Sequence, residues 1–214
     1  MQPTESELAD AVHRAARAAL LDLFREHPDH RFYYCTLVTS GEGYGPALSA
    51  WSAEALAAES ERQGCAPLDI KWSYADSPFC CYGEAHLEPV RPLFEARGDL
   101  FDLPDDEADA EFELRLRAME TAVARLDAEG VFGTGADRHR VVATVEVPSE
   151  DGNDERTLRL NPPEGLADWA VETGADVVRP TPTDAPPAVL ELPSPVQTTL
   201  WTCEVLTSHD DRNV

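Results

Sequence analysis

Two adjacent thiols and a nearby histidine are the side chains whose types could do covalent chemistry. Cys80 and Cys81 lie six and five residues before His86, and a thiol becomes a strong nucleophile when a histidine takes its proton. Separation along the chain does not fix distance in the fold, however, and neighbouring cysteines are often small packing residues. The sequence contains no C-x-x-C pair, P-loop, nucleophile elbow or zinc-protease motif. We therefore predict no catalytic residue.

The histidines and cysteines do not fall at the spacing of a metal site. His27 and His30 are three residues apart, but they flank a proline that ends a predicted helix, and no second ligand pair follows nearby. Cys80 and Cys81 are too close in the chain to form a relaxed disulfide. We expect no metal and no cofactor.

Aromatic residues gather between residues 70 and 83, a segment that we call the seam. It holds four aromatic residues and the only lysine of the chain. Ile70, Trp72 and Tyr74 alternate with polar or small residues, which predicts a short strand that turns these three side chains inward. Two interpretations of Trp72 and Asp76 are open. In the first, Trp72 is a core aromatic residue and Asp76 caps a turn. In the second, both belong to a recognition surface. The recognition surface would consist of Trp72, Ser73, Asp76 and Tyr82.

The net charge restricts the class of partner. The chain has 214 residues and a formal net charge of -24, from 41 acidic and 17 basic side chains. Such a charge repels nucleic acid and anionic membranes, and it attracts a basic protein partner. The alternative is that the acidity serves solubility in a salt-rich or high-GC organism and involves no partner.

Cysteine usage and hydropathy indicate the compartment. The cysteines number five, which is odd, and the start of the chain has no signal-peptide pattern. Both features predict a cytoplasmic protein with reduced thiols. No apolar run approaches the roughly 18 residues that a membrane span needs, so we expect no membrane contact. The sequence makes no prediction of oligomeric state.

Regular elements should position these residues in a single domain over residues 1–178. Apolar residues at intervals of three and four predict helices at 5–26, 54–64, 106–129 and 166–173. Apolar runs and alternation predict strands at 32–39, 47–51, 70–75, 140–147 and 157–160. The fold class that follows is α+β: an antiparallel sheet of about five strands packed against two long helices and shorter ones.

The composition changes after residue 178. Residues 179–195 are rich in proline and have no apolar stripe, which predicts a spacer. Residues 196–207 alternate again, which predicts a strand that returns to the domain. Residues 208–214 should be a disordered tail.

Four short segments resemble, in the same order, segments of one protein family. The family has an RWSPADW segment, a characteristic first strand, an LD-x-EG-x-FG helix end and an LNP segment. The matching pieces here are Lys71–Pro78, Phe32–Thr39, Leu126–Gly133 and Leu160–Pro162. Over about residues 5–165 the chain thus resembles the family catalogued as domain of unknown function 4303. The resemblance implies a bacterial source and a fold, and it implies no reaction. Some members of that family resemble proteins encoded beside toxin–immunity genes.

Two hypotheses of different classes follow. The first is an acidic protein-binding module, with toxin neutralisation by an immunity-like or antitoxin-like protein as its most concrete form. The second is a small enzyme with a pocket at the Trp72–Tyr82 seam, which would also use Asn161. A deep cavity lined by Asp76, Cys81 and His86 would favour the enzyme. A flat acidic face bordered by exposed aromatic side chains would favour the binding module.

Overall fold

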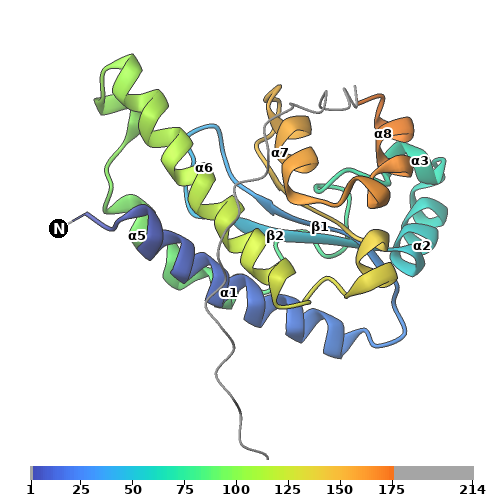
Figure 1. Ribbon diagram of the computed structural model, residues 1–214. Helices are drawn as coiled ribbons and strands as arrows, with labels where there is room; N and C mark the ends of the chain where they lie inside the picture. The colour runs from blue at the N-terminus through green and yellow to red at the C-terminus, as the bar shows by residue number, and fades with distance from the viewer. Residues whose placement is uncertain (1, 176–214) are drawn as a thin grey trace, which may run out of the picture. The chain divides into compact units, whose positions relative to one another are not determined.

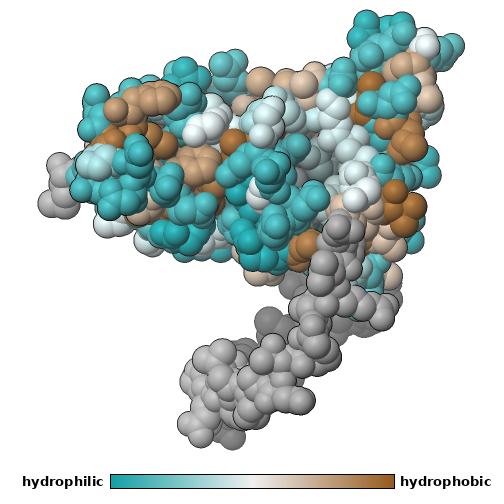
Figure 2. Space-filling view, turned by 90° about the horizontal axis from the view of Figure 1, so that it is seen from above, coloured by the Kyte–Doolittle hydropathy of each residue, from teal (hydrophilic) through white to brown (hydrophobic). Residues whose placement is uncertain are grey.

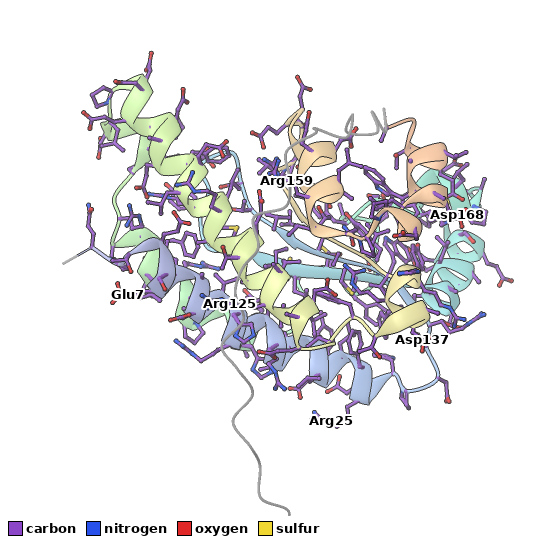
Figure 3. The ribbon with its side chains drawn as sticks, in the orientation of Figure 1. Glu7, Arg25, Arg125, Asp137, Arg159 and Asp168 are labelled. Atoms are coloured by element: carbon purple, nitrogen blue, oxygen red, sulfur yellow. The ribbon has the colours of Figure 1, made fainter. Side chains whose placement is uncertain are left out.

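A computed structural model of the chain describes residues 2–175. Its two long helices, α1 (Glu5–Glu26) and α6 (Asp105–Ala128), pack side by side and confirm the predicted long helices (Figure 1). Thr4 begins α1 in a capping box: its hydroxyl accepts from the Glu7 N–H, and the Glu7 carboxylate accepts from the Thr4 N–H. An ion pair from Arg125 of α6 to Asp10 fastens the two helices at their surface (Figure 3).

The sheet has three strands in the described part of the chain, in the order β2-β1-β3. The strands are β1 (Phe32–Val38), β2 (Ala47–Ser52) and β3 (Val142–Glu146). β2 runs antiparallel to β1, as predicted, whereas β3 runs parallel to it. The prediction of a five-stranded antiparallel sheet is therefore wrong, although the α+β class is confirmed. Parallel pairing needs a long crossover, and α6 lies in the connection between β2 and β3.

Two of the predicted strands are not strands. Residues 70–75 comprise the end of α3 (Pro67–Ile70) followed by turns, because Pro67 starts a helical turn and Asp69 accepts from the Ala66 N–H in front of it. Residues 157–160 belong to α7 (Asn153–Leu160). The alternation of Leu158 and Leu160 that suggested a strand covers too few residues to exclude a helix.

The remaining helices are short. The α-helices are α2 (Ala53–Gln63), α4 (Glu84–Leu87), α5 (Arg91–Glu95) and α8 (Ala167–Thr173). The 3₁₀ turns are η1 (Glu88–Val90), η2 (Leu100–Asp102), η3 (Gly135–Arg140) and η4 (Pro163–Gly165). Ser52 and Gly64 cap α2 as predicted.

The predicted spacer at 179–195, strand at 196–207 and tail at 208–214 lie outside the described residues. Within residues 2–175, no helix is both long and apolar enough to cross a membrane.

The two faces of the sheet differ in character. One face carries small and apolar residues, all buried: Cys35, Leu37, Leu48, Ala50, Ala143 and Val145. The other face carries hydrogen-bonding side chains: Tyr34, Thr36, Ser49, Trp51, Thr144 and Glu146. Figure 1 shows α1 on one side of the sheet and α7 and α8 on the other. Hydrogen bonds join the polar face to the seam and to α7, so any polar site on the sheet lies there.

Candidate functional site

The seam is fastened to β2 by hydrogen bonds. The Trp51 Nε1–H donates to the Ser73 carbonyl at 2.7 Å, and the Ser49 hydroxyl donates to the Tyr74 carbonyl at 2.8 Å. Further along, the Tyr82 N–H donates to the Leu48 carbonyl at 3.0 Å. The seam therefore covers the outer edge of β2 and part of the polar face, which protects the edge from pairing with another chain.

Trp72 is half-buried and is held between the sheet and α8. Its ring packs edge-on against the rings of Tyr33 and Tyr34, with centroids 5.4 and 5.6 Å away. Its Nε1–H donates to Glu172 Oε2 at 2.9 Å, and Lys71 Nζ donates to the same carboxylate. Trp72 thus packs against the apolar core but is only partly buried, whereas the strand interpretation required it to point inward.

A cavity of about 360 Å³ opens beside Trp72; we call it the seam hollow. Its aromatic walls are Tyr34, Trp72 and Trp169. Its neutral polar side chains are Thr144, Asn153, Thr157 and Thr173. Its acidic side chains are Glu146, Glu150, Asp151 and Asp154. Lysine and arginine are absent from this lining among the residues that the structure describes. The seam hollow is therefore an acceptor-rich site with aromatic walls.

Glu146, the last residue of β3, lies in the seam hollow without a basic partner. The Tyr34 hydroxyl donates to its Oε2 atom at 2.5 Å, and no ion pair of residues 2–175 includes it. Burial raises the pKa of Glu146, and hydrogen bonds from Tyr34 and Thr36 oppose this only in part. Burial also raises the pKa of Asp154, and neighbouring Glu155 adds to the shift. Both carboxylates would be stabilised by a cation.

Of the five predicted site residues, the structure brings only Trp72 to the seam hollow. The Ser73 hydroxyl accepts from the Asp76 N–H at 3.4 Å, within a turn of the seam. The Tyr82 hydroxyl donates to Glu26 of α1 at 2.5 Å. Ser73, Asp76 and Tyr82 thus do not line the seam hollow beside Trp72.

Asn161 has its hydrogen-bonding groups committed to the fold. Its Oδ1 accepts from the Ala143 N–H at 2.9 Å, and its Nδ2 donates to the Ala143 carbonyl at 2.7 Å. Asn153 makes the same pair of bonds to Val147. The two amides satisfy backbone groups at the outer edge of β3. Asn161 does not line the seam hollow.

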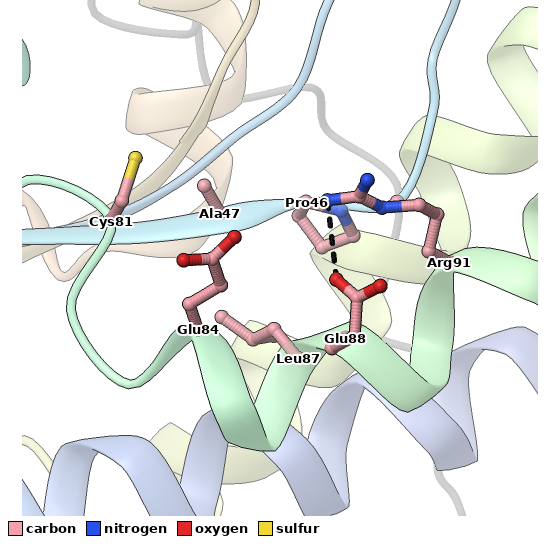
Figure 4. Close-up of a pocket in the computed structure, with 8 residues that line it drawn as sticks. Pro46, Ala47, Cys81, Glu84, Leu87, Glu88 and Arg91 are labelled. Carbon is pink, nitrogen blue, oxygen red and sulfur yellow. Dashed lines mark ion pairs between the residues drawn. The ribbon is translucent and has the colours of Figure 1, made fainter.

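The side chains that the enzyme hypothesis needs are not gathered around one cavity. Cys81 lines a different pocket of about 120 Å³, together with Glu84 and the Glu88–Arg91 ion pair (Figure 4). The His86 imidazole contacts Asp22 of α1, with Nε2 2.8 Å from Oδ2. The Cys80 and Cys81 sulfur atoms are 3.8 Å apart, and burial raises the pKa of Cys80. In the part of the chain that the structure describes, no group of three or more His, Cys, Asp or Glu side chains could hold a metal ion.

Sequence reasoning missed Tyr34, Glu146 and Trp169. Tyr34 and Glu146 are 112 residues apart, and parallel pairing of β1 with β3 brings them to one face. A usable signal exists: Thr144 and Glu146 are polar residues at alternate positions of a valine-rich strand. A carboxylate in such a strand predicts a polar site on the face where it lies.

Comparison with known proteins yields a family. Neither the curated proteins nor the solved structures contain a match to this chain. A family model, described as a domain of unknown function, matches residues 12–162, which is more than half of the chain. This match includes all three strands, both long helices in whole or in large part, and Asn161. The chain therefore belongs to the family Domain of unknown function (DUF4303).

Proposed function

We propose that this protein is an acidic protein-binding module that takes a cationic side chain of a basic partner protein into the seam hollow. The observation that carries the proposal is Glu146, a partly buried carboxylate with a phenol for a neighbour and, among the residues that the structure describes, no basic ion-pair partner. Burying a charge without a counter-charge is costly. A partner that supplies the counter-charge recovers this cost on binding, which makes the interaction selective for cations.

The lining suits a guanidinium group in particular. A guanidinium has five N–H donors in one plane and stacks well on aromatic rings. The seam hollow offers the rings of Trp72 and Trp169, the Glu146 carboxylate, and threonine hydroxyls as further acceptors. Its volume of about 360 Å³ is large enough to hold one long side chain.

The net charge of -24 supports the same partner class at longer range. A strongly acidic surface speeds the encounter with a basic protein, and the effect weakens as salt is added. Neutralisation of a basic toxin is the concrete form of the proposal, since some members of the family resemble proteins encoded beside toxin–immunity genes. A small enzyme at the seam has less support, because Cys81, His86 and Asp76 do not line one cavity.

The test is a titration of the protein with a fluorescently labelled hexa-arginine peptide, followed by fluorescence polarisation. Glu146→Gln keeps the shape of the side chain and its acceptor for Tyr34 but removes the charge. We expect it to weaken binding about tenfold or more. The matched control is Glu61→Gln, which removes one exposed charge on α2, outside the seam hollow; we expect less than a twofold change. Equal losses in the two variants, or no binding by the unmodified protein, would overturn the proposal.

A further inference from the structure

A second and larger hollow lies at the start of α6; we call it the α6 groove. Its volume is about 620 Å³. Six of its lining residues are apolar or glycine: Gly41, Leu100, Phe101, Leu103, Ala108 and Phe112. The other four are acidic: Asp105, Asp109, Glu113 and Glu150. In the view of Figure 2, apolar and hydrophilic surface lie side by side at the end of the molecule where α6 begins. An apolar floor with an acidic rim fits a partner that is apolar on one side and basic on the other.

Phe101 is the most exposed part of the apolar floor. Its side chain is 80% exposed, although the adjacent Leu100 is buried. Phe101 sits on the 3₁₀ turn η2, where its N–H donates to the Asp99 carboxylate at 3.0 Å. The aromatic ring is thus presented to solvent by an ordered turn. Exposed aromatic side chains on ordered supports are typical anchors of protein interfaces.

The walls of the α6 groove are held together by a buried arginine. Arg115 of α6 is fully buried; its Nη1 donates to the Glu42 carbonyl at 3.1 Å and its Nη2 to the Gly98 carbonyl at 2.7 Å. It thereby ties the β1–β2 loop and the loop before η2 to α6. At Gly43, φ is +62°, and a Cβ atom would come within 3.1 Å of Phe112. A preformed groove of this kind loses little conformational entropy when a partner binds.

The acidic rim is a stripe of like charges along α6. Asp105, Asp109 and Glu113 are four residues apart in sequence, and like charges at this spacing destabilise a helix. The helix dipole favours Asp105 in the first turn, but its effect fades before Asp109 and Glu113. None of the three forms an ion pair with any residue between 2 and 175. A stripe of lysine or arginine on a partner would relieve the repulsion.

Glu150 connects the two hollows, because it lines both the α6 groove and the seam hollow. Its carboxylate accepts from Arg156, and its carbonyl accepts from Asn153 Nδ2 at 3.0 Å. This shared wall is therefore fixed in place. A segment lying in the α6 groove would be led past Glu150 to the acidic and aromatic lining beside Trp72.

We propose that the α6 groove and the seam hollow form one continuous docking track for a single basic amphipathic segment of a partner protein. The inference rests on the proposed function and extends it. Apolar side chains of the segment pack on Phe101 and Phe112, its cationic side chains face Asp109 and Glu113, and an arginine beyond them enters the seam hollow. The segment is recognised by its pattern as well as by its charge.

The experiment compares three labelled peptides by fluorescence polarisation. The first has about 18 residues of leucine, lysine and alanine with leucine at helical spacing and an arginine at one end; the second is its scrambled version; the third is hexa-arginine. The unmodified protein should bind the amphipathic peptide about tenfold more tightly than the scrambled one. Phe101→Ser should abolish this preference and leave hexa-arginine binding unchanged. Since Phe101 is 80% exposed, the variant should fold normally; a thermal melt checks this.

Two further variants separate apolar contact from charge. Leu68→Ser changes a side chain that is 54% exposed on α3 and lines neither hollow, and it should leave all affinities unchanged. The double variant Asp109→Asn, Glu113→Gln should weaken the amphipathic peptide about tenfold, whereas Glu61→Gln, Glu164→Gln, which removes two exposed charges elsewhere, should change affinity less than twofold.

Each outcome has one reading. Hexa-arginine binding that depends on Glu146, combined with no preference for the amphipathic peptide, would overturn the docking track and leave the proposed function intact. A preference that survives Phe101→Ser would also overturn the track. Binding of the amphipathic peptide that is indifferent to Glu146→Gln, while the same variant weakens hexa-arginine binding, would refute the joining of the two hollows.

Discussion

Glu111 and Glu146 are both partly buried carboxylates, but among the residues that the structure describes only Glu111 has basic partners. Glu111 lies between two guanidinium groups: Arg115 Nε donates to its Oε1 at 2.8 Å, and Arg97 Nη2 donates to its Oε2 at 2.5 Å. Burial alone would raise the pKa of Glu111, but the hydrogen bonds from Arg97 and Arg115 outweigh it and the pKa is lowered. Among the residues that the structure describes, Glu146 has only the hydroxyl groups of Tyr34 and Thr36 as hydrogen-bond donors, and its pKa is raised.

Under the proposed function, the difference separates a carboxylate that holds the fold together from one that binds a partner's cation. Around Glu111 the chain supplies the counter-charge itself, and Arg97 also donates to the Pro3 carbonyl, so that the start of the chain, α6 and two loops are joined. Around Glu146 no residue between 2 and 175 supplies a basic partner, which lowers stability at neutral pH. Sites that keep such a cost are often binding sites. The predictions below ask whether the two carboxylates divide in this way.

The largest effect is expected at Arg115. Arg115→Met removes a fully buried guanidinium and leaves the Glu42 and Gly98 carbonyls without their donor. We expect the free energy of unfolding to fall by about 3–5 kcal/mol, as when one partner of a buried pair is removed. Urea titration measures the change. The control Arg117→Met breaks an exposed pair with Glu5 and should cost less than about 1 kcal/mol. Similar losses of unfolding free energy in both variants would show that the buried contacts of Arg115 stabilise the fold no more than an exposed ion pair does.

A smaller effect is expected at Trp72, which covers Tyr34 beside Glu146. A fully buried tryptophan would cost about 3–5 kcal/mol on truncation, but Trp72 is half-buried, so we expect roughly 2 kcal/mol for Trp72→Ala. Hexa-arginine binding should fall about tenfold as well. Trp72→Phe keeps one six-membered ring but loses the pyrrole ring and its donor to Glu172, and it should cost about 1 kcal/mol. If Trp72→Ala bound hexa-arginine as tightly as the unmodified protein, the Trp72 ring would have no part in recognition.

The elements that depend on long local patterns could be predicted from the sequence. The stripe from Leu8 to Leu23 and the stripe from Phe112 to Leu126 each repeat over several turns, so both long helices were predicted within about two residues. The helix caps at Thr4, Ser52 and Gly64 depend on the residue type at each position, so the sequence predicts them equally well. The β1–β2 hairpin follows from two strands joined by a glycine-rich loop.

What depends on tertiary contact could not be predicted. The alternation of Ile70, Trp72 and Tyr74 covers three residues, and it is outweighed by the bonds that Trp51 and Ser49 make to the seam carbonyls. The parallel pairing of β3 follows from the path of the chain through α6, which no local pattern encodes. The candidate site was therefore predicted only at Trp72, because Tyr34 and Glu146 meet through that pairing.

The smallest change in stability, and one of opposite sign, is expected at Glu146. Because its pKa is raised in the folded protein, the native state binds more protons than the unfolded state between the ordinary value of 4.5 and the raised value. Stability therefore falls as pH rises through that window. Glu146→Gln does not titrate and keeps an acceptor for Tyr34, so it should melt at a slightly higher temperature than the unmodified protein at pH 7.

This stabilisation should disappear below pH 4.5, where the carboxyl group is protonated in both the folded and the unfolded state. Thermal melts of the two proteins at several pH values measure the difference. The same variant should bind hexa-arginine about tenfold more weakly at pH 7. A variant that is more stable and binds less well would show that the Glu146 charge serves recognition at the expense of the fold. A variant that is less stable at pH 7 would place Glu146 with Glu111, as a carboxylate that the fold itself requires.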